Sequence, residues 1–141
     1  MEFSTNGILS ALTTPFTRNG KEVDYDRLLG LAQAVVKQGA TGFFCFGTTG
    51  EGLLMTLEER EQGTALLARE MGKRAQVIPH TGCIDLASTL RLTRHARSCG
   101  AAAAAIVAPF YYGYDDEALF NYYAQIARAV PDFPILLYNI P

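Results

Sequence analysis

Residues 42–52 read Gly42-Phe43-Phe44-Cys45-Phe46-Gly47-Thr48-Thr49-Gly50-Glu51-Gly52. The first half is an apolar, aromatic-rich run of strand length that breaks at Gly47. Two adjacent threonines then lie between glycines, and Thr56-Leu57-Glu58-Glu59 follows with the pattern of a helix capping box. The segment therefore predicts a strand, a glycine-bounded hydroxyl loop and a helix, in that order.

The loop between this strand and this helix has donors that suit a small carboxylate or phosphate. Glycines let backbone amides come close to a bound group, and threonine hydroxyls add short donors beside them. The loop is not a P-loop, because no Gly-Lys-Ser/Thr follows, and its glycine spacing is not the dinucleotide fingerprint. A tight turn without a ligand is the alternative, since short glycine-containing loops are common between strands and helices.

Strands and helices alternate along the rest of the chain. Apolar runs at 8–14, 76–80, 102–108 and 134–141 predict the other strands, and helices are predicted at about 24–38, 57–71, 85–100 and 115–130. The alanines at 101–105 suit a helix by propensity, but the glycine before them and the proline after them favour a strand with small side chains. In the last helix, the residues expected to face the core are Leu119, Phe120, Tyr123, Ile126 and Val130.

This alternation predicts one α/β domain with a parallel sheet and right-handed crossovers. Two architectures fit 141 residues and five strands. One is a doubly wound, flavodoxin-like sheet with strand order 2-1-3-4-5. The other is the first five strands and four helices of a (β/α)₈ TIM barrel, in sequential order 1-2-3-4-5, whose full length is about 250 residues. Composition does not separate them.

Composition narrows the functional class. The net charge is −2 and 49% of residues are apolar, which gives no indication of a nucleic-acid or membrane partner. No signal-peptide pattern is expected at the N-terminus. Three cysteines, Cys45, Cys83 and Cys99, are odd in number and lack a C-x-x-C spacing, so we expect neither a disulfide framework nor a zinc site. A reduced, cytoplasmic protein is the resulting expectation.

Motifs at the predicted strand ends separate the two architectures. Gly47-Thr48-Thr49-Gly50-Glu51, Pro109-Phe110-Tyr111-Tyr112 and Tyr138-Asn139-Ile140-Pro141, together with Ala11-Leu12-Thr13-Thr14-Pro15-Phe16, closely resemble the dihydrodipicolinate synthase / N-acetylneuraminate lyase family. The match runs from about Gly7 to Pro141. The resemblance implies a TIM barrel, with residues 1–141 as the N-terminal part of a single barrel domain. It also implies pyruvate-type substrates, a lysine Schiff base, and no metal or other cofactor.

The resemblance implies roles for individual residues. Thr48 and Thr49, beside Gly47, would bind the substrate carboxylate, and Thr48 would also relay protons. Tyr138 would be the acid/base hydroxyl next to the Schiff base, since a phenol needs such a polar relay to exchange protons near neutral pH. Tyr111 would be inserted by a neighbouring subunit of a homo-oligomer, typically a tetramer. Without the family, simple packing is the alternative for both tyrosines.

Other polar residues carry weaker expectations. His80 would end the third strand on the same face and touch substrate, although a lone histidine there is more often structural. Glu51 is expected to order or cap the loop, and Cys83 to line the rim. His95 lies late on a helix, where a cation is favoured, and is given no chemistry.

The sequence departs from the family at the nucleophile. The family's Schiff-base lysine lies on the sixth strand, whereas the lysines here are Lys21, Lys37 and Lys73, none of which ends a buried strand. We expect either a part of a longer chain or a partner that supplies the rest, and this chain alone to be inactive.

Three classes of function remain at this stage. Gly-Thr-Thr-Gly-Glu favours a dihydrodipicolinate synthase-like, pyruvate-dependent class I aldolase or lyase. Phe110 and His80-Thr81-Gly82-Cys83 favour an N-acetylneuraminate lyase or a 2-keto-3-deoxy-sugar aldolase. A non-catalytic fragment, or a small anion-binding α/β domain, is the alternative of another class.

Overall fold

Five parallel strands follow one another in chain order. In the computed structural model, which describes residues 3–4 and 6–140, the strands are β1 (Leu9–Ala11), β2 (Gly42–Cys45), β3 (Gln76–Pro79), β4 (Ala104–Val107) and β5 (Ile135–Tyr138). The helices are α1 (Tyr25–Lys37), α2 (Leu57–Met71), α3 (Leu86–Ser98) and α4 (Asp116–Ala129), with a short 3₁₀ helix, η1 (Gly52–Leu54), before α2. The predicted elements are all present, and each strand is shorter than its apolar run.

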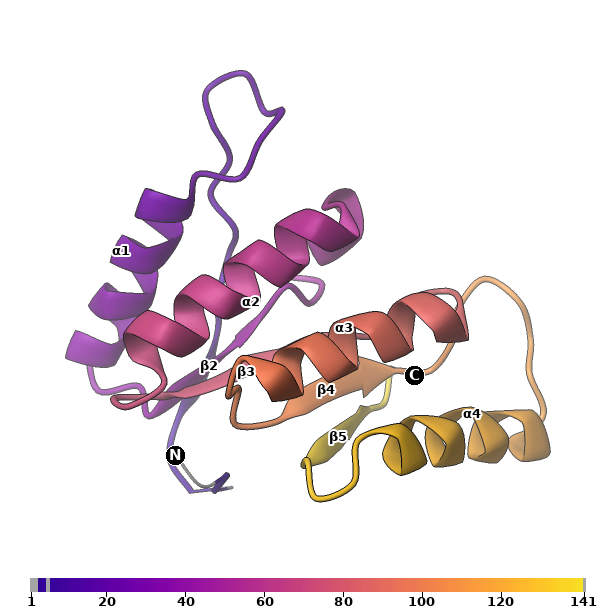
Figure 1. Ribbon diagram of the computed structural model, residues 1–141. Helices are drawn as coiled ribbons and strands as arrows, with labels where there is room; N and C mark the ends of the chain where they lie inside the picture. Colours follow the sequence, from indigo (N-terminus) through magenta and orange to yellow (C-terminus); the bar gives the residue numbers. More distant parts are fainter. Residues whose placement is uncertain (1–2, 5, 141) are drawn as a thin grey trace.

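The order of the strands distinguishes the two predicted architectures. β1 pairs with β2, β2 with β3, and β4 with β5, all in parallel. A parallel bridge between His80 and Ala105 joins β3 to β4, and the amide of Ala102 donates to the carbonyl of Val77 at 2.9 Å. Figure 1 shows the four helices in chain order along one side of these strands. The order 1-2-3-4-5 excludes the flavodoxin-like alternative and confirms a partial (β/α)₈ TIM barrel.

Apolar side chains pack on both faces of the strands. The helix-facing core includes Phe43, Leu67 and Met71 around β1–β3, and Ile106 and Ile126 around β4. On the opposite, inner face, a smaller cluster of Ile78, Ala103 and Ala105 packs with Phe44 and Leu136. The end of the alanine run, Ala104 and Ala105, thus begins the buried strand β4, because small side chains fit between neighbouring strands and the helices that cover them.

Side chains cap the starts of the four helices, and the capping box predicted at Thr56 is confirmed. Asp24, Asp85 and Asp115 each accept a hydrogen bond from the amide three residues further on. At the start of α2, Thr56 and Glu59 form a reciprocal capping box.

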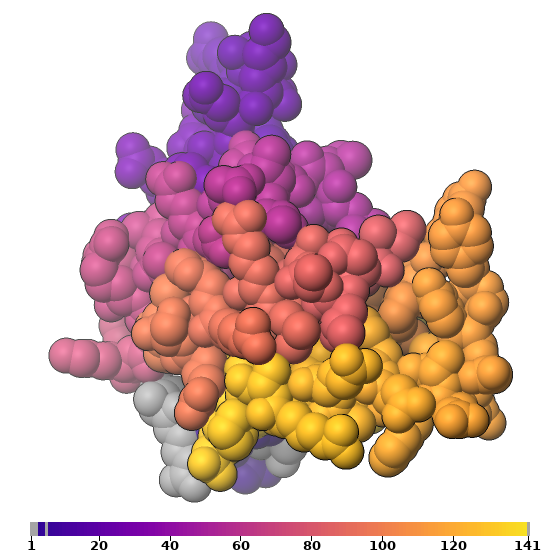
Figure 2. All heavy atoms as spheres, turned by 45° about the vertical axis from the view of Figure 1, so that its right-hand side comes forward, coloured from indigo at the N-terminus to yellow at the C-terminus, as the bar shows by residue number. Residues whose placement is uncertain are grey.

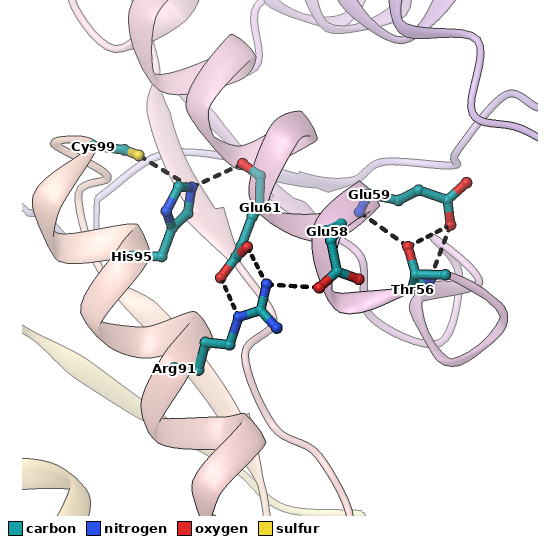
Figure 3. A network of polar contacts seen from close by, with 7 residues as sticks. All are labelled: Thr56, Glu58, Glu59, Glu61, Arg91, His95 and Cys99. Carbon is teal, nitrogen blue, oxygen red and sulfur yellow. Dashed lines mark hydrogen bonds and ion pairs between the residues drawn. The ribbon is translucent and has the colours of Figure 1, made fainter.

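Polar contacts join α2 to α3 on the outer surface. Figure 3 shows Arg91 of α3 against Glu58 and Glu61 of α2, with N–O distances of 2.8 and 2.7 Å. The same view shows His95, whose Nε2 lies 2.9 Å from the carbonyl oxygen of Glu61. His95 therefore ties two helices together, in keeping with the absence of any predicted chemistry there.

One prediction for α4 is wrong. Phe120 was expected in the core, but its side chain is 70% exposed, and Tyr122 is buried instead. The hydroxyl of Tyr122 lies 2.9 Å from Oγ1 of Thr89, so its one polar atom is satisfied inside the protein. An apolarity pattern alone ranks phenylalanine above tyrosine and misses this partner. Pro141, which the predicted last strand included, lies outside the described residues.

Among the helices of residues 3–4 and 6–140, none is both long enough and apolar enough to cross a membrane.

Candidate functional site

A cavity of about 340 Å³ opens at the carboxyl ends of β2 to β5. Gly47 and Thr48 contribute to its wall from the loop after β2, His80 from the end of β3, Val107 from β4 and Tyr138 from β5. Parallel strands bring their carboxyl ends to one edge, which is where barrel sites form. Residues far apart in sequence thus meet in one cavity.

The loop after β2 folds back on itself. The amide of Glu51 donates to the carbonyl of Thr48 at 3.1 Å, and the hydroxyl of Thr14, just after β1, donates to the carbonyl of Gly50 at 2.6 Å. No protein acceptor takes the amides of Thr48 or Thr49 anywhere in the described part of the chain. These two amides and two exposed hydroxyls are therefore available to an outside group.

Close packing explains the glycines of this loop. A Cβ atom on Gly52 would collide with the carbonyl of Phe46, and one on Gly47 would collide with the ring of Phe44. The backbone of Phe46 is in the left-handed region, at φ 61°. Its side chain is buried, and its ring lies against Gly63 of α2. The sequence predicted these glycines either for ligand approach or for a tight turn, and the close packing shows that the fold of the loop itself requires them.

The structure brings some predicted site residues together and leaves others apart. Gly47, Thr48 and Tyr138 line the same cavity, whereas Thr49 is exposed and is not part of the lining. Tyr111 is 85% exposed and stacks edge-on against Tyr112, with ring centroids 5.0 Å apart. Figure 2 shows the segment between β4 and α4, in light orange, standing out at one side of the molecule. The catalytic and binding roles of these residues stay predictions.

Three rings meet at the wall of the cavity, which His80 and Tyr138 line. Phe44, His80 and Tyr138 are arranged edge to face, with centroids 5.6 to 6.0 Å apart. Such contacts are favourable beyond the area they bury. The ring of Tyr138 is therefore held by neighbours from two other strands.

His80 is a buried, neutral member of the wall. Its side chain is 6% exposed, and Nε2 accepts a hydrogen bond from the amide of Val107 at 3.4 Å. Burial, and then the nearby charge of Arg60, lowers the pKa of His80 from 6.5 to about 4. At neutral pH this imidazole is uncharged.

Arg60 on α2 is a residue that the sequence analysis missed. The residue is buried, with an exposed fraction of 3%, and its guanidinium donates to the carbonyls of His80 at 2.7 Å and Gly82 at 3.3 Å. It also contacts Sγ of Cys83 at 3.3 Å. The available signal was spacing: Arg60 precedes the buried Leu67 and Met71 by two and three helical turns, so it lies on the apolar stripe.

The weaker candidates lie as follows. Cys83 is buried and does not line the main cavity, but it lines an adjacent hollow with Gly52, Leu53 and Phe110, and burial raises the pKa of its thiol. Glu51 lines the cavity and precedes η1 in a left-handed conformation, φ 52°, but its side chain makes no capping hydrogen bond. All three lysines, Lys21, Lys37 and Lys73, are exposed, and none belongs to the lining of the cavity as described.

Comparisons with known proteins agree with this geometry. Residues 4–141 match the model of the Dihydrodipicolinate synthetase family. A 4-hydroxy-tetrahydrodipicolinate synthase from Thermus thermophilus is 43% identical over 135 residues, which cover 96% of this chain and 44% of that protein. An N-acetylneuraminate lyase from Escherichia coli is 33% identical over 141 residues, covering 100% of this chain and 47% of the lyase.

A solved structure gives the same result. The dihydrodipicolinate synthase from Acinetobacter baumannii, complexed with pyruvate, superposes with a TM-score of 0.91 at 34% identity, over 98% of this chain and 47% of that one. The chain thus spans somewhat less than half the length of the relatives it matches. Because the family model covers nearly all of its residues, the chain belongs to the dihydrodipicolinate synthetase family.

Proposed function

We propose that this chain forms the keto-acid-binding part of a pyruvate-dependent class I aldolase or lyase similar to dihydrodipicolinate synthase. The observation that carries the proposal is that Thr48 and Tyr138 line one cavity at the carboxyl ends of the strands. The pyruvate complex of the Acinetobacter relative supports a 2-keto acid as the ligand. Residues 1–141 would be the N-terminal part of one barrel domain, in a homo-oligomer.

Substrate binding would begin at the loop after β2. The free amides and hydroxyls of Thr48 and Thr49, next to Gly47, would accept the carboxylate of the 2-keto acid as a set of neutral donors. Because the loop is already fixed by its own turn and by Thr14, little reorganisation is needed when the anion arrives. The keto carbon would then point toward Tyr138, on the opposite wall.

Proton transfer would use the hydroxyls of Tyr138 and Thr48. A relay shortens each proton step to one hydrogen bond, which lets a weak acid act near neutral pH. Tyr111 would complete the relay from a neighbouring subunit, since its exposed side chain lies outside the cavity of its own chain. The amine that attacks the C2 carbonyl with loss of water would come from a lysine on the sixth strand of the barrel.

Reductive trapping tests the proposal. Borohydride reduces an imine between pyruvate and a lysine to a stable amine, which intact-mass analysis detects. We expect no adduct on residues 1–141, whose lysines are all exposed, and one adduct per chain on the gene product at its natural length. An adduct on the 141-residue chain would show that the nucleophile has been misplaced. No adduct on the natural-length protein would overturn the class I assignment.

An N-acetylneuraminate lyase or a 2-keto-3-deoxy-sugar aldolase is the second candidate. His80 in the cavity wall and the 33% identity to the Escherichia coli lyase favour it. Release of pyruvate from N-acetylneuraminate by the natural-length protein would select this candidate over the synthase.

A further inference from the structure

The loop after β3, residues 80–83, is held by polar groups of two helices. From α2, the guanidinium of Arg60 donates to the carbonyl of His80 at 2.7 Å. From α3, Oγ1 of Thr89 accepts a hydrogen bond from the amide of Cys83 at 3.0 Å. The first residue of this loop, His80, lines the cavity, so contacts that fix the loop also fix part of the cavity wall.

The hydroxyl group of Thr89 is at the centre of these contacts. Its oxygen lies 3.0 Å from the amide nitrogen of Cys83, 3.0 Å from the carbonyl oxygen of Asp85 and 2.9 Å from the hydroxyl of Tyr122. An amide only donates and a carbonyl only accepts, so all three contacts are hydrogen bonds when Thr89 donates to Asp85 and Tyr122 donates to Thr89. A hydroxyl donates once and accepts twice, so residues of this chain satisfy Thr89 completely.

A second pair of hydroxyls extends this arrangement one helical turn along α3. Oγ1 of Thr93 donates to the carbonyl of Thr89 at 2.7 Å, and the hydroxyl of Thr81 lies 2.8 Å from Oγ1 of Thr93. Because the proton of Thr93 is used at that carbonyl, Thr81 is the donor of the second bond. We call Thr81, Thr89, Thr93 and Tyr122 the hydroxyl network. All four residues are buried, so these hydrogen bonds are enclosed by the described part of the chain.

His80 links the position of this loop to Tyr138. The two rings lie edge to face, with centroids 6.0 Å apart. The loop that carries Thr48 is fixed separately, by its own turn and by a hydrogen bond from Thr14. A shift of the loop after β3 is therefore expected to move the ring of Tyr138 and to leave Thr48 in place.

The hydroxyl network fixes directions as well as distances. Apolar side chains of the same shape can replace both partners of a buried hydrogen bond at little cost in stability. A fully satisfied polar network instead specifies one arrangement of the groups that it joins. The network is therefore better suited to setting the position of the loop than to stabilising the fold.

We propose that Thr89 is a positioning residue for the reaction in the cavity. Through the amide of Cys83 it holds the loop after β3, and with that loop His80, so that the ring of Tyr138 stays in the orientation needed for proton transfer. Tyr122 supports Thr89 from α4. This inference rests on the proposed function, because it takes Tyr138 as the hydroxyl that transfers protons.

Two replacements of Thr89 test the inference in the gene product at its natural length. Thr89→Val keeps the shape of the side chain without the hydroxyl, whereas Thr89→Ser keeps the hydroxyl that makes all three hydrogen bonds. Proton NMR measures kcat and KM for the exchange of pyruvate methyl protons with deuterium. We expect Thr89→Val to lower kcat about tenfold while KM stays within about twofold, because a small displacement of a reacting group slows chemistry more than binding. Thr89→Ser should retain most of the rate.

Two further variants separate positioning from stability. Thr64→Val is the matched control, because Thr64 is also a buried threonine but lies on α2, outside the hydroxyl network. It should leave kcat and KM unchanged, whatever its effect on the urea unfolding midpoint. Tyr122→Phe removes one hydrogen bond to Thr89 and should lower kcat about threefold at an unchanged KM.

The outcomes remain distinguishable if a variant does not fold. An unchanged kcat in a folded Thr89→Val protein, or an equal loss of kcat in Thr64→Val, would overturn the inference and leave the proposed function intact. If Thr89→Val does not fold, an unchanged kcat in Tyr122→Phe has the same meaning. Failure of the unaltered protein to exchange the methyl protons of pyruvate would overturn both.

Discussion

Two loops at the same edge of the strands are built in opposite ways. The loop after β2, residues 46–52, is fixed by its own turn, by a hydrogen bond from Thr14 and by glycines that leave no room for a side chain. The segment after β4, residues 110–114, makes no backbone hydrogen bond within the described chain, and Tyr111 and Tyr112 are 85% and 66% exposed. The first loop is held by hydrogen bonds within this chain, whereas the second exposes two tyrosine rings to solvent.

This difference suits the two loops to different tasks: the first to binding an anion, and the second to contact with a neighbouring copy of the chain. A group that must bind an anion benefits from donors that are already in place, because no ordering cost is then paid on binding. A group that acts on a neighbouring copy can instead stay exposed until assembly covers it, and large exposed apolar patches commonly mark such contacts. The comparison therefore predicts that changes in the first loop affect the chain itself and changes in the second affect the assembled protein.

The same glycine-to-alanine change should separate the loops most strongly. Gly52→Ala places a methyl group against the carbonyl of Phe46, and we expect a loss of about 3 kcal/mol in unfolding free energy. Gly113→Ala has no atom within 4 Å of the added carbon and should stay within about 1 kcal/mol of the unaltered protein. Urea unfolding measures both. Similar losses in the two variants would mean that the loops do not differ in rigidity.

His80, in the wall of the cavity, should cause much of the pH dependence of the unfolding free energy. Its pKa is lowered from 6.5 to about 4 in the folded protein, so the unfolded chain binds a proton first as the pH falls. The contribution of neutral His80 to the unfolding free energy is fully present above pH 6.5. It should be lost between pH 6.5 and 4, by up to about 3 kcal/mol.

His80→Gln provides the control, because glutamine does not titrate. Unfolding midpoints measured from pH 7.5 to 4 should lose the part of the slope that His80 contributes. An identical slope in the variant would show that other groups cause the decline.

Removing one hydroxyl from the fixed loop should slow catalysis in the natural-length protein. If Thr48 relays protons, Thr48→Val should lower the exchange of pyruvate methyl protons with deuterium about 100-fold, and Thr48→Ser should retain most of it. Proton NMR follows this exchange without a second substrate. Equal activity of the valine and serine variants would exclude a hydroxyl role.

The exposed loop should show the smallest and most selective effect. In the assembled protein, Tyr111→Phe should lower the same exchange about tenfold, since a relay group is lost from the neighbouring site. Tyr112→Phe, the adjacent exposed tyrosine, is the matched control and should change little. An equal effect of both substitutions would assign the loop to packing rather than to proton transfer.

Much of this architecture could be predicted from the sequence because local rules and the fold agree. Asp24, Asp85 and Asp115 cap helices as their positions indicate, and the predicted strand at 102–108 is present as β4, which begins at Ala104. The common edge of the strand-end motifs followed from parallel pairing alone. The meeting of Thr48 and Tyr138 in one cavity is a consequence of that pairing.

Features that depend on side-chain partners could not be predicted in this way. Tyr122 is buried because Thr89 meets its hydroxyl, and Arg60 is buried because the loop after β3 turns its carbonyls toward it. Neither partner is near in sequence. Periodicity ranks Phe120 as core, and it places Arg60 on the apolar stripe of α2 without indicating what its guanidinium contacts. The same limit applies to the neutral state of His80, which follows first from its burial and then from the charge of Arg60, not from residues next to it in sequence.

The contact between Phe46 and Gly63 should restrict which residues can occur together at positions 46 and 63 in this family. The Phe46 ring occupies the space that a side chain at position 63 would need, and a Cβ there would lie 2.6 Å from the ring. A larger residue at position 63 therefore needs a smaller residue at position 46 before it or together with it. An aromatic ring at position 46 likewise needs a glycine at position 63. The two positions are therefore expected to change as a correlated pair, because glycine at 63 leaves room for a large residue in the loop that carries Thr48 and Thr49.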